Sequence, residues 1–469
     1  MNRPLSILWF RRDLRFDDHP ALAKAARRGA VLALFVADPA LLDWAGRPRR
    51  GFLIRTLIDM DRRLRDFGAN LVVYSGRPED VVPMVASRVG ATEVHISADF
   101  APYGAERDRR VARALGSIPL VATGSPYAIS PPRLTTATGN SYKVFTPFFR
   151  AWHRHGWPDP APSDPHQVDW SAAPSEELPE EPSLPVSMVL PRAGEEAAQN
   201  AWWTFREENL AGYAAARDRP DLDVTSRLSA YLHLGVLHPR TLLSGLAPED
   251  ERFRTELAWR EFYASVLWSW PRSARTNFNS RMDGLRIENG PEARALFGAW
   301  CEGRTGYPII DAGMRQLMTE AWMHNRVRML VASFLVKDLH LDWRWGARHF
   351  MRHLVDGDLA SNQHGWQWAA GTGTDASPYF RIFNPVTQSK RFDPDGDYIR
   401  RWVPELRTVA VPYVHEPWRS PTPLDYIDPI IDHHAERKIS LAEYANLRSS
   451  DRSSACDDSQ GTSSENLGD

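Results

Sequence analysis

The chain has 469 residues, of which 43% are hydrophobic and 25% charged, and its formal net charge is -2. This length suits two or three domains, and the composition excludes a disordered or fibrous protein. No run of about 18 apolar residues is present, so we expect no membrane span. The N-terminus shows no secretory signal. Only Cys301 and Cys456 occur, too few for a disulfide framework or an iron–sulfur cluster. We therefore expect a cytoplasmic protein. Asp356 and Asp358 could form a metal-binding pair, but His353 and His364 are poorly spaced to complete it, so we expect no metal site.

The near-zero net charge hides an uneven distribution along the chain. Residues 158–196 contain nine Pro and carry a net charge of -8, and the end from Ser449 to Asp469 carries -4. The rest of the chain therefore carries +10, which could offer a basic face to nucleic acid. Arginine supplies 52 of the 57 basic residues. This excess of arginine has two alternative explanations, codon usage in a GC-rich genome or bidentate recognition of phosphate.

The first 130 residues alternate short apolar runs with amphipathic stretches. This pattern predicts a doubly wound parallel sheet with helices on both faces, a Rossmann-like α/β fold. The predicted strands are Ser6–Phe10, Val31–Val36, Asn70–Tyr74, Glu93–Ile96 and Pro119–Ala122. The predicted helices are Pro20–Arg28, Gly51–Phe67, Asp80–Val89 and Ala105–Leu115. No G-x-G-x-x-G sequence follows the first strand, so the usual dinucleotide fingerprint is absent.

Three further segments follow the predicted α/β domain of residues 1–130. Residues 131–199 form an interdomain linker, whose Pro-rich, acidic part we expect to be largely irregular. Residues 200–447 show helical spacing throughout, which predicts an all-α domain. The Ser- and Asp-rich end, 448–469, is predicted to be a disordered acidic tail.

The helical part contains four polar and aromatic clusters. Spacing places Glu256, Trp259, Arg260 and Tyr263 on one helical face, and likewise Trp322, Asn325, Arg326 and Met329. The hydroxyl-rich segment 225–229 suits an anion at a helix start. Residues 356–368 combine two acids, an amide and two Trp. Each cluster taken alone also fits a capped helix or a partly buried ion pair.

Taken together, these segments resemble the DNA photolyase/cryptochrome family, most closely the class I cyclobutane pyrimidine dimer photolyases. The resemblance spans residue 5 to about residue 445 and is interrupted by the acidic linker. The matching segments are WFRRDLR (9–15), TSRLSAYLHLGVLHPR (225–240), ELAWREFY (256–263), TGYPIIDAGMRQL (305–317), WMHNRVRM (322–329), SFLVKDLHLDWR (333–344) and DGDLASNQHGWQWAAGTGTDASPYFRIFNP (356–385). Long matches in a conserved order are far more specific than any single short motif.

The resemblance implies an FAD cofactor, active in its reduced form, in the all-α domain. By motif match, Arg328 pairs with Asp356 beside the flavin ring, and Asn362 faces flavin N5. An amide at this position supports the reduced flavin, which favours repair over signalling. The residues expected to bind FAD are Tyr213, Thr225, Ser226, Arg227, Leu228, Ser229, Trp322, Asn325, Arg328, Asp356, Asp358 and Asn362.

The resemblance also implies a substrate, UV-damaged DNA that contains cyclobutane pyrimidine dimers. The dimer flips out of the helix stack, accepts an electron from excited reduced FAD, splits and returns the electron. Glu256 matches the acid that supports the dimer radical anion. The expected substrate and DNA contacts are Arg217, Glu256, Trp259, Arg260, Asn325, Arg326, Met329, Trp368, Arg381 and Gln388. We expect the protein to act as a monomer.

One departure from the family concerns photoreduction of the flavin along three tryptophans. Trp366 matches the member next to the flavin, and Trp343 matches the middle one. The third belongs near residues 288–290, where this chain has no Trp. We expect the last hop to use another aromatic residue, with Trp300 as the first candidate, or photoreduction to be slow.

The N-terminal domain of this family holds a light-harvesting antenna. Glu106 resembles the acid that binds 5,10-methenyltetrahydrofolate, whereas Asp99 resembles a position used for 8-hydroxy-5-deazaflavin. The match slightly favours the folate, and either antenna is possible. An alternative function for the whole chain is a cryptochrome-like blue-light photoreceptor without repair activity.

Overall fold

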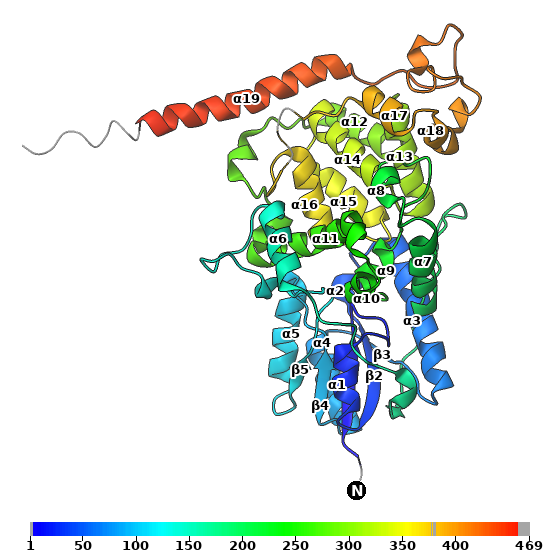
Figure 1. The fold of residues 1–469 in the computed structure, drawn as a ribbon, viewed down its shortest axis with the longest axis vertical. Helices are drawn as coiled ribbons and strands as arrows, with labels where there is room; N and C mark the ends of the chain where they lie inside the picture. Colours follow the sequence, from blue (N-terminus) through cyan, green and yellow to red (C-terminus); the bar gives the residue numbers. More distant parts are fainter. Residues whose placement is uncertain (1–2, 377, 379–380, 458–469) are drawn as a thin grey trace, which may run out of the picture. The chain divides into compact units, whose positions relative to one another are not determined.

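The computed structural model describes residues 3–376, 378 and 381–457 (Figure 1). The chain divides into two compact units. The first comprises Met1–Ala274, Gln316–Met323 and Arg348–Gln363, and the second comprises Arg275–Arg315, His324–Ala347 and His364–Asp469. These units group segments by packing and do not coincide with the boundaries predicted at residues 130 and 199. The predicted boundaries concern independent folding, and they remain predictions.

The first unit is built on a parallel sheet in the order β3-β2-β1-β4-β5 (Figure 1). The strands are β1 (Leu5–Phe10), β2 (Ala30–Ala37), β3 (Val72–Ser75), β4 (Glu93–Ile96) and β5 (Leu120–Ala122). The strand order reverses between β1 and β4, because β2 and β3 lie on one side of β1 and β4 and β5 on the other. The doubly wound sheet is therefore confirmed. In such sheets, ligands bind at the carboxyl ends of the strands beside this reversal.

Helices connect the parallel strands, as right-handed crossovers require. They are α1 (Pro20–Ala26), α2 (Pro39–Leu42), α3 (Arg47–Asp66), α4 (Pro78–Val89) and α5 (Pro102–Ala114). Apolar side chains of α4 and α5 form one core with the strands, and α1 packs against β1, β2 and β4. The predicted strands and helices are confirmed with end shifts of a few residues. The strands could be predicted because each is a nearly continuous apolar run. Parallel strands are buried on both faces and therefore lack the alternation of polar and apolar residues.

The segment predicted as a linker contains more structure than expected. A two-residue strand, β6 (Trp170–Ser171), pairs in parallel with Val31 and Leu32 of β2. Helix α6 (Phe145–His155) packs against α11 (Glu251–Ser269) through Phe145 and Phe148. Both elements belong to the first unit.

A buried carboxylate on α11 ties this segment down. Glu261 is 2% exposed and accepts hydrogen bonds from the indole N–H of Trp152 at 2.7 Å and the backbone N–H groups of Ala128 and Ile129 at 2.5 and 3.1 Å. Burial raises the pKa of Glu261, and these three donors act against that shift. One side chain thus fixes both α6 and the loop before it.

Replacing this carboxylate tests that role. We expect Glu261→Ala to lower the free energy of unfolding by about 2–4 kcal/mol, because three buried donors lose their acceptor. Urea unfolding followed by tryptophan fluorescence measures the change. The exposed Glu208→Ala at the end of α7 is the control, and equal midpoints for the two variants would contradict the assignment.

The remaining helices follow α6 along the chain. In chain order they are α7 (Glu195–Glu208), α8 (Tyr213–Ala216), α9 (Ser229–Leu234), α10 (Pro239–Ser244), α11, α12 (Pro291–Cys301), α13 (Pro308–Glu320), α14 (Asn325–Ser333), α15 (Trp343–His353), α16 (Leu359–Ala370), α17 (Pro385–Phe392), α18 (Asp397–Trp402) and α19 (His433–Asp457). A single π-helical turn, Phe334–Asp338, follows α14. The all-α character predicted from residue 200 is confirmed. None of the helices in the described part is long and apolar enough to cross a membrane.

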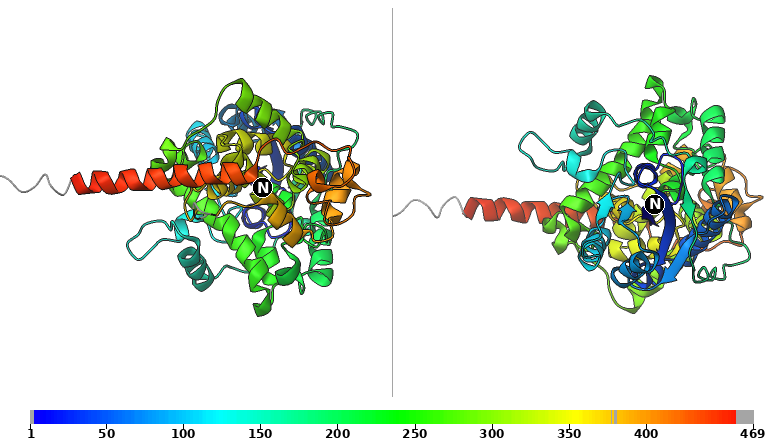
Figure 2. Two further views of the ribbon diagram at one scale, coloured as in Figure 1. Left: turned by 90° about the horizontal axis from the view of Figure 1, so that it is seen from above. Right: turned by 90° about the horizontal axis from the view of Figure 1, so that it is seen from below.

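Helix α19 corrects the predicted C-terminal boundary. It appears as one continuous helix in Figures 1 and 2 and runs past residue 447 to Asp457. Residues 448–457 are thus helical rather than disordered, and the rest of the predicted acidic tail, 458–469, lies outside the described residues. Side-chain contacts fix the helix within the second unit: His433 Nδ1 lies 2.5 Å from Asp338 Oδ1, and Glu436 lies 2.8 Å from His340 Nε2.

Candidate active site

The predicted site residues are divided between the two units. The first unit carries the segment 213–229, Trp322, the acids Asp356 and Asp358, Asn362 and the polar face of α11. The second carries Asn325, Arg326, Arg328, Met329, the tryptophans Trp300, Trp343, Trp366 and Trp368, and Arg381 and Gln388. The expected pairing of Arg328 with Asp356 remains a prediction.

Tyr213 forms a rigid start to the predicted cofactor segment. Its ring packs edge-on against Phe205 and Phe253, with centroids 5.7 and 5.4 Å apart. Burial raises the pKa of Tyr213, so its hydroxyl stays protonated and can donate a hydrogen bond. The guanidinium of Arg217 lies 5.7 Å from the centre of the same ring.

Thr225 provides a direct test of whether this segment fits a bound anion. Its Oγ1 is buried and has no hydrogen-bond partner. Leaving a buried hydroxyl unpaired costs free energy, and a phosphate oxygen would remove that cost. Thr225 and the adjacent hydroxyl of Ser226 therefore fit the phosphate-binding role, and with it the FAD cofactor.

Arg227, one of the expected FAD-binding residues, is held by two carboxylates of the first unit. It adopts a left-handed backbone conformation at φ 49° and pairs with Asp223 at 2.8 Å and Glu320 at 3.1 Å. Its guanidinium lies 4.3 Å above the ring of Trp322. Because two carboxylates already balance its charge, Arg227 chiefly orders the segment and covers Trp322.

The prediction that Trp322 shares a helical face with Asn325, Arg326 and Met329 is wrong. Helix α14 begins only at Asn325, where the ring Nδ1 of His324 caps it by accepting from the N–H of Arg326 at 3.2 Å. Ala321 has a left-handed φ of 50° just before this start. Trp322 therefore precedes the helix and does not share a helical face with Asn325, Arg326 and Met329.

Asp358 forms a buried ion pair that the sequence did not reveal. Its carboxylate lies 2.6 Å from the guanidinium of Arg12, which directly follows β1, and accepts from the N–H of Ser361 at the start of α16. His233 Nδ1 lies 3.9 Å away. Burial opposes ionisation of Asp358, but Arg12 and, less strongly, His233 outweigh it and hold its pKa well below the usual range. Arg12 lies in the matched WFRRDLR segment, which was the available signal.

His233 makes this cluster sensitive to acid. Burial lowers the pKa of His233 to about 4, and the nearby carboxylate of Asp358 only partly offsets this. The unfolded chain takes up the proton near pH 6.5, whereas the folded chain does so only near pH 4. The stability contributed by neutral His233 is therefore lost as the pH falls from 6.5 towards 4.

We expect His233→Gln to reduce the pH dependence of folding. The free energy of unfolding should fall by about 1–2 kcal/mol less between pH 7 and pH 5 in this variant than in the unmodified protein. Urea unfolding at both pH values measures the difference. The exposed His153→Gln should keep the full dependence, and an unaltered dependence in His233→Gln would refute the assignment.

Asn362 lies on the first turns of α16, four residues after Asp358. Its amide nitrogen donates to Oε1 of Gln363 at 2.9 Å, and Gln363 donates to the carbonyl of Ala274 at 2.6 Å. This network fixes the rotamer of the amide. The predicted position of Asn362 at flavin N5 remains a prediction.

Helix α11 presents the predicted dimer-binding face. Glu256 is partly exposed and accepts a hydrogen bond from Arg217. Trp259 stacks on Phe145 of α6, with centroids 3.6 Å apart and an interplanar angle of 5°. The acid and the indole are thus both held in place on one helix, as their spacing predicted.

Arg260 differs from the other predicted DNA contacts. It donates to the carbonyls of Pro126 at 2.9 Å and Leu232 at 3.0 Å, and its guanidinium lies 4.9 Å from the centre of the Tyr127 ring. Arg260 therefore anchors two backbone segments, a structural role that its position on the polar face did not suggest.

The second unit contains the three tryptophans that are expected to carry electrons to the flavin. Trp366 is 2% exposed, and Trp343 is 3% exposed with its indole N–H donating to Asn277 Oδ1 at 2.8 Å. Trp300 is fully buried, with its ring centre 6.0 Å from that of Trp366. Trp300 therefore does not itself reach solvent, and its expected part in the last hop stays a prediction.

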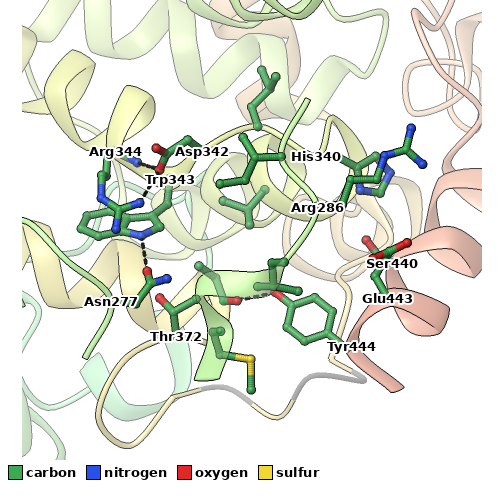
Figure 3. Close-up of a pocket in the computed structure, with 16 residues that line it drawn as sticks. Asn277, Arg286, His340, Asp342, Trp343, Arg344, Thr372, Ser440, Glu443 and Tyr444 are labelled. Atoms are coloured by element: carbon green, nitrogen blue, oxygen red, sulfur yellow. Dashed lines mark hydrogen bonds and ion pairs between the residues drawn. The ribbon is translucent and has the colours of Figure 1, made fainter. Parts of the chain in front are cut away.

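A small cavity borders Trp343 in the second unit (Figure 3). It has a volume of about 40 Å³, and Leu285, Arg286 and Ile287 occupy the stretch just before the expected third tryptophan. Tyr444 of α19 also borders it and donates its hydroxyl to the carbonyl of Ala370.

Predicted DNA contacts of the second unit lie on α14 and near α17. Arg326 places its guanidinium 4.5 Å from the centre of the Phe392 ring. Asn384 caps α17 by accepting from the N–H of Thr387 at 2.9 Å, which sets the position of Gln388 one turn into the helix. Arg381 is exposed.

The two candidate antenna residues have different surroundings. Asp99 follows β4 at the strand-order reversal and lies 3.4 Å from Arg107. Burial opposes its ionisation, but Arg107, Arg12 and Arg11 lower the pKa of Asp99. Glu106 lies on the exposed side of α5 and pairs with Arg109 at 2.8 Å. A cavity of about 10 Å³ lies near Asp99, lined by Arg12, Phe100, Ala101, Tyr127, Ala264, Leu267, Asp358, Leu359 and Ala360.

Comparison with known families identifies the class of protein. Residues 6–166 match the family described as DNA photolyase, and residues 253–446 match the FAD binding domain of DNA photolyase. The first match covers strands β2 to β5 and nearly all of β1, and the second covers the helices from most of α11 to the first half of α19.

Individual relatives extend over almost the whole chain. The deoxyribodipyrimidine photo-lyase of Halobacterium salinarum is 39% identical over 95% of this chain and 99% of its own length. A class III photolyase from Agrobacterium tumefaciens has a TM-score of 0.89 at 36% identity, over 96% of this chain and 98% of its own. An archaeal photolyase from Sulfolobus tokodaii, solved with two FAD molecules, has a TM-score of 0.83 at 30% identity, over 94% of this chain and 100% of its own. The chain belongs to the DNA photolyase family. These likenesses leave class I and class III unseparated.

Proposed function

We propose that this protein repairs cyclobutane pyrimidine dimers in DNA by light-driven electron transfer from reduced FAD. The observation that carries the proposal is the pairing of Glu256 with Arg217 beside the stacked Trp259 on α11. This face combines an acid that can hydrogen-bond a pyrimidine carbonyl with an aromatic wall for a flipped base. Packing alone does not require a partly exposed acid next to a stacked indole on one helical face.

FAD, when bound, supplies the light-absorbing electron donor. The hydroxyls of Thr225 and Ser226 hold its phosphates, and Tyr213 donates from its protonated hydroxyl. The remaining residues of the proposed cofactor site are Arg227, Leu228, Ser229, Trp322, Asn325, Arg328, Asp356, Asp358 and Asn362. The low pKa of Asp358 keeps this carboxylate charged and Arg12 in place across the working pH range.

A further set of residues is proposed to bind the substrate. Glu256 hydrogen-bonds the dimer carbonyl, Trp259 and Trp368 pack against the flipped bases, and Met329 contacts a pyrimidine. The proposed DNA-backbone contacts are Arg217, Arg260, Asn325, Arg326, Arg381 and Gln388. Binding of this kind is salt-dependent and largely independent of sequence. For Arg260, only the donors left over from Pro126 and Leu232 can reach DNA.

The protein is further proposed to act as a monomer in the cytoplasm. A flipped dimer requires only one binding face, and the proposed dimer-binding residues Glu256 and Trp259 lie on one helix, α11. The sparse use of cysteine suits a reducing compartment.

Dimer-containing DNA under blue light tests the repair function. The reduced, FAD-loaded protein should remove dimers in the light and leave them in the dark. Chromatography of the digested DNA measures the remaining dimers. No loss of dimers, or equal loss in the dark, would defeat the proposal and favour a photoreceptor without repair activity.

The role of the acid on α11 has its own test. We expect Glu256→Ala to lower the yield of dimer splitting per absorbed photon by roughly threefold to tenfold. Binding to dimer-containing DNA should change less, because Arg217 loses its partner and becomes available to phosphate. The control is Glu251→Ala at the exposed start of the same helix. A full yield with weakened binding would show that Glu256 acts only in binding.

The antenna is proposed to be either 5,10-methenyltetrahydrofolate at Glu106 or 8-hydroxy-5-deazaflavin at Asp99. The burial and arginine partners of Asp99 at the strand-order reversal support the second site. We expect Asp99→Asn to release the chromophore, whereas Glu106→Gln should retain it. The absorption spectrum of the extracted chromophore and its ratio to FAD measure the outcome. Loss in Glu106→Gln alone would reverse the assignment.

A further inference from the structure

Photoreduction of the flavin needs a path from the buried Trp366 to solvent, and the path through Trp343 stops short. Trp343 is 3% exposed and its indole N–H is held by Asn277, so it cannot release this proton directly to water. The guanidinium of Arg344 lies 5.0 Å from the centre of its ring, which disfavours a positive charge there, although Asp342 partly balances that guanidinium. Beyond the ring lies the cavity bordered by Arg286 and Ile287 (Figure 3).

A second line of aromatic rings starts at the same Trp366. Its ring centre lies 6.0 Å from that of Trp300, Trp300 lies 5.8 Å from Phe297, and Phe297 lies 5.3 Å from Trp345. All four rings belong to the second unit. Trp345 is partly exposed, unlike Trp300. This line of contacts therefore connects the buried Trp366 with solvent.

Local structure favours this second line. Gly346 allows the close approach of Trp366, because a Cβ there would lie 2.1 Å from the indole ring. The indole N–H of Trp300 donates to the carbonyl of Val331 at 3.1 Å. A carbonyl oxygen that accepts from the indole N–H stabilises a positive charge on the ring, and Val331 does this for Trp300 as Asn277 does for Trp343. At Trp343, the guanidinium of Arg344 opposes this stabilisation.

We infer that electrons reach the flavin of this protein from Trp345 through Trp300 and Trp366, with Phe297 as a bridge. This inference rests on the proposed FAD-dependent function: with oxidised FAD bound and excited by light, Trp366 would be the residue that gives up the first electron. Trp300 then reduces the Trp366 radical cation. Trp345 reduces Trp300 across Phe297, which stays neutral throughout. Trp345 finally loses its indole proton to water, and a thiol reductant in solution supplies the replacement electron and proton.

The test follows tryptophan radicals by transient absorption in full-length protein loaded with oxidised FAD, together with proton release to a pH-indicator dye. Trp345→Phe should lower the yield of long-lived deprotonated tryptophan radical and of released protons by about tenfold. Trp345→Tyr should restore proton release, because tyrosine can be oxidised and lose a proton at the same place. The exposed Trp44→Phe is the matched control and should leave both signals unchanged.

The result that overturns the inference is an unchanged radical and proton yield in Trp345→Phe. Failure of Trp345→Tyr to restore proton release would overturn it as well, because the defect would then come from altered packing. A Trp343→Phe variant that keeps most of the long-lived radical supports the path through Trp300. One that abolishes the radical, while Trp345→Phe retains it, places the path on Trp343 instead.

Repair by chemically reduced protein separates this inference from the proposed function. Trp345→Phe should repair dimers as well as the unmodified protein once its flavin has been reduced in advance. Absence of repair in the unmodified protein would defeat the proposed function, whereas the radical yields would still decide the path of the electron.

Discussion

The ion pair between Arg12 and Asp358 is the constraint on which the first unit depends. Arg12 follows β1 at the point where the strand order reverses, and Asp358 caps the start of α16. Two charges removed from water are tolerable only when each satisfies the other, so the end of the sheet and the start of this helix must form together. Breaking one partner typically costs about 3–5 kcal/mol, which is a large part of the stability of a folded protein.

The same pair links two predicted sites. Arg12 contributes to the low pKa of Asp99, the candidate antenna residue, and also to that of Asp358 in the proposed FAD site. One guanidinium therefore influences the charge of both carboxylates. Replacing Arg12 would therefore raise the pKa of both carboxylates, although Asp99 and Asp358 are distant in the sequence.

Sequence reasoning succeeded where local patterns carry the information. The five strands are continuous apolar runs, and the spacing of Glu256 and Trp259 on α11 follows from helical geometry alone. It failed where a contact with a residue distant in the sequence determines where a helix begins or which partner a side chain has. Trp322 lies outside α14 because His324 caps the helix. Arg260 donates to two backbone carbonyls that are more than twenty residues away in the sequence. Trp300 has no signature of burial in its own segment, because its environment comes from Trp366 and Val331.

The two-residue strand β6 has a consequence for solubility. Strand β3 pairs only with Leu34–Ala37 of β2, which would leave the first half of this central, apolar strand as an open sheet edge. Trp170 and Ser171 occupy that edge, and the ring of Trp170 packs against Phe16 at 5.5 Å. Open edges of this kind pair with other chains and seed aggregation. The acidic, Pro-rich segment that carries β6 thus protects the sheet from self-association, since proline cannot donate to a growing ladder and like charges repel a second copy.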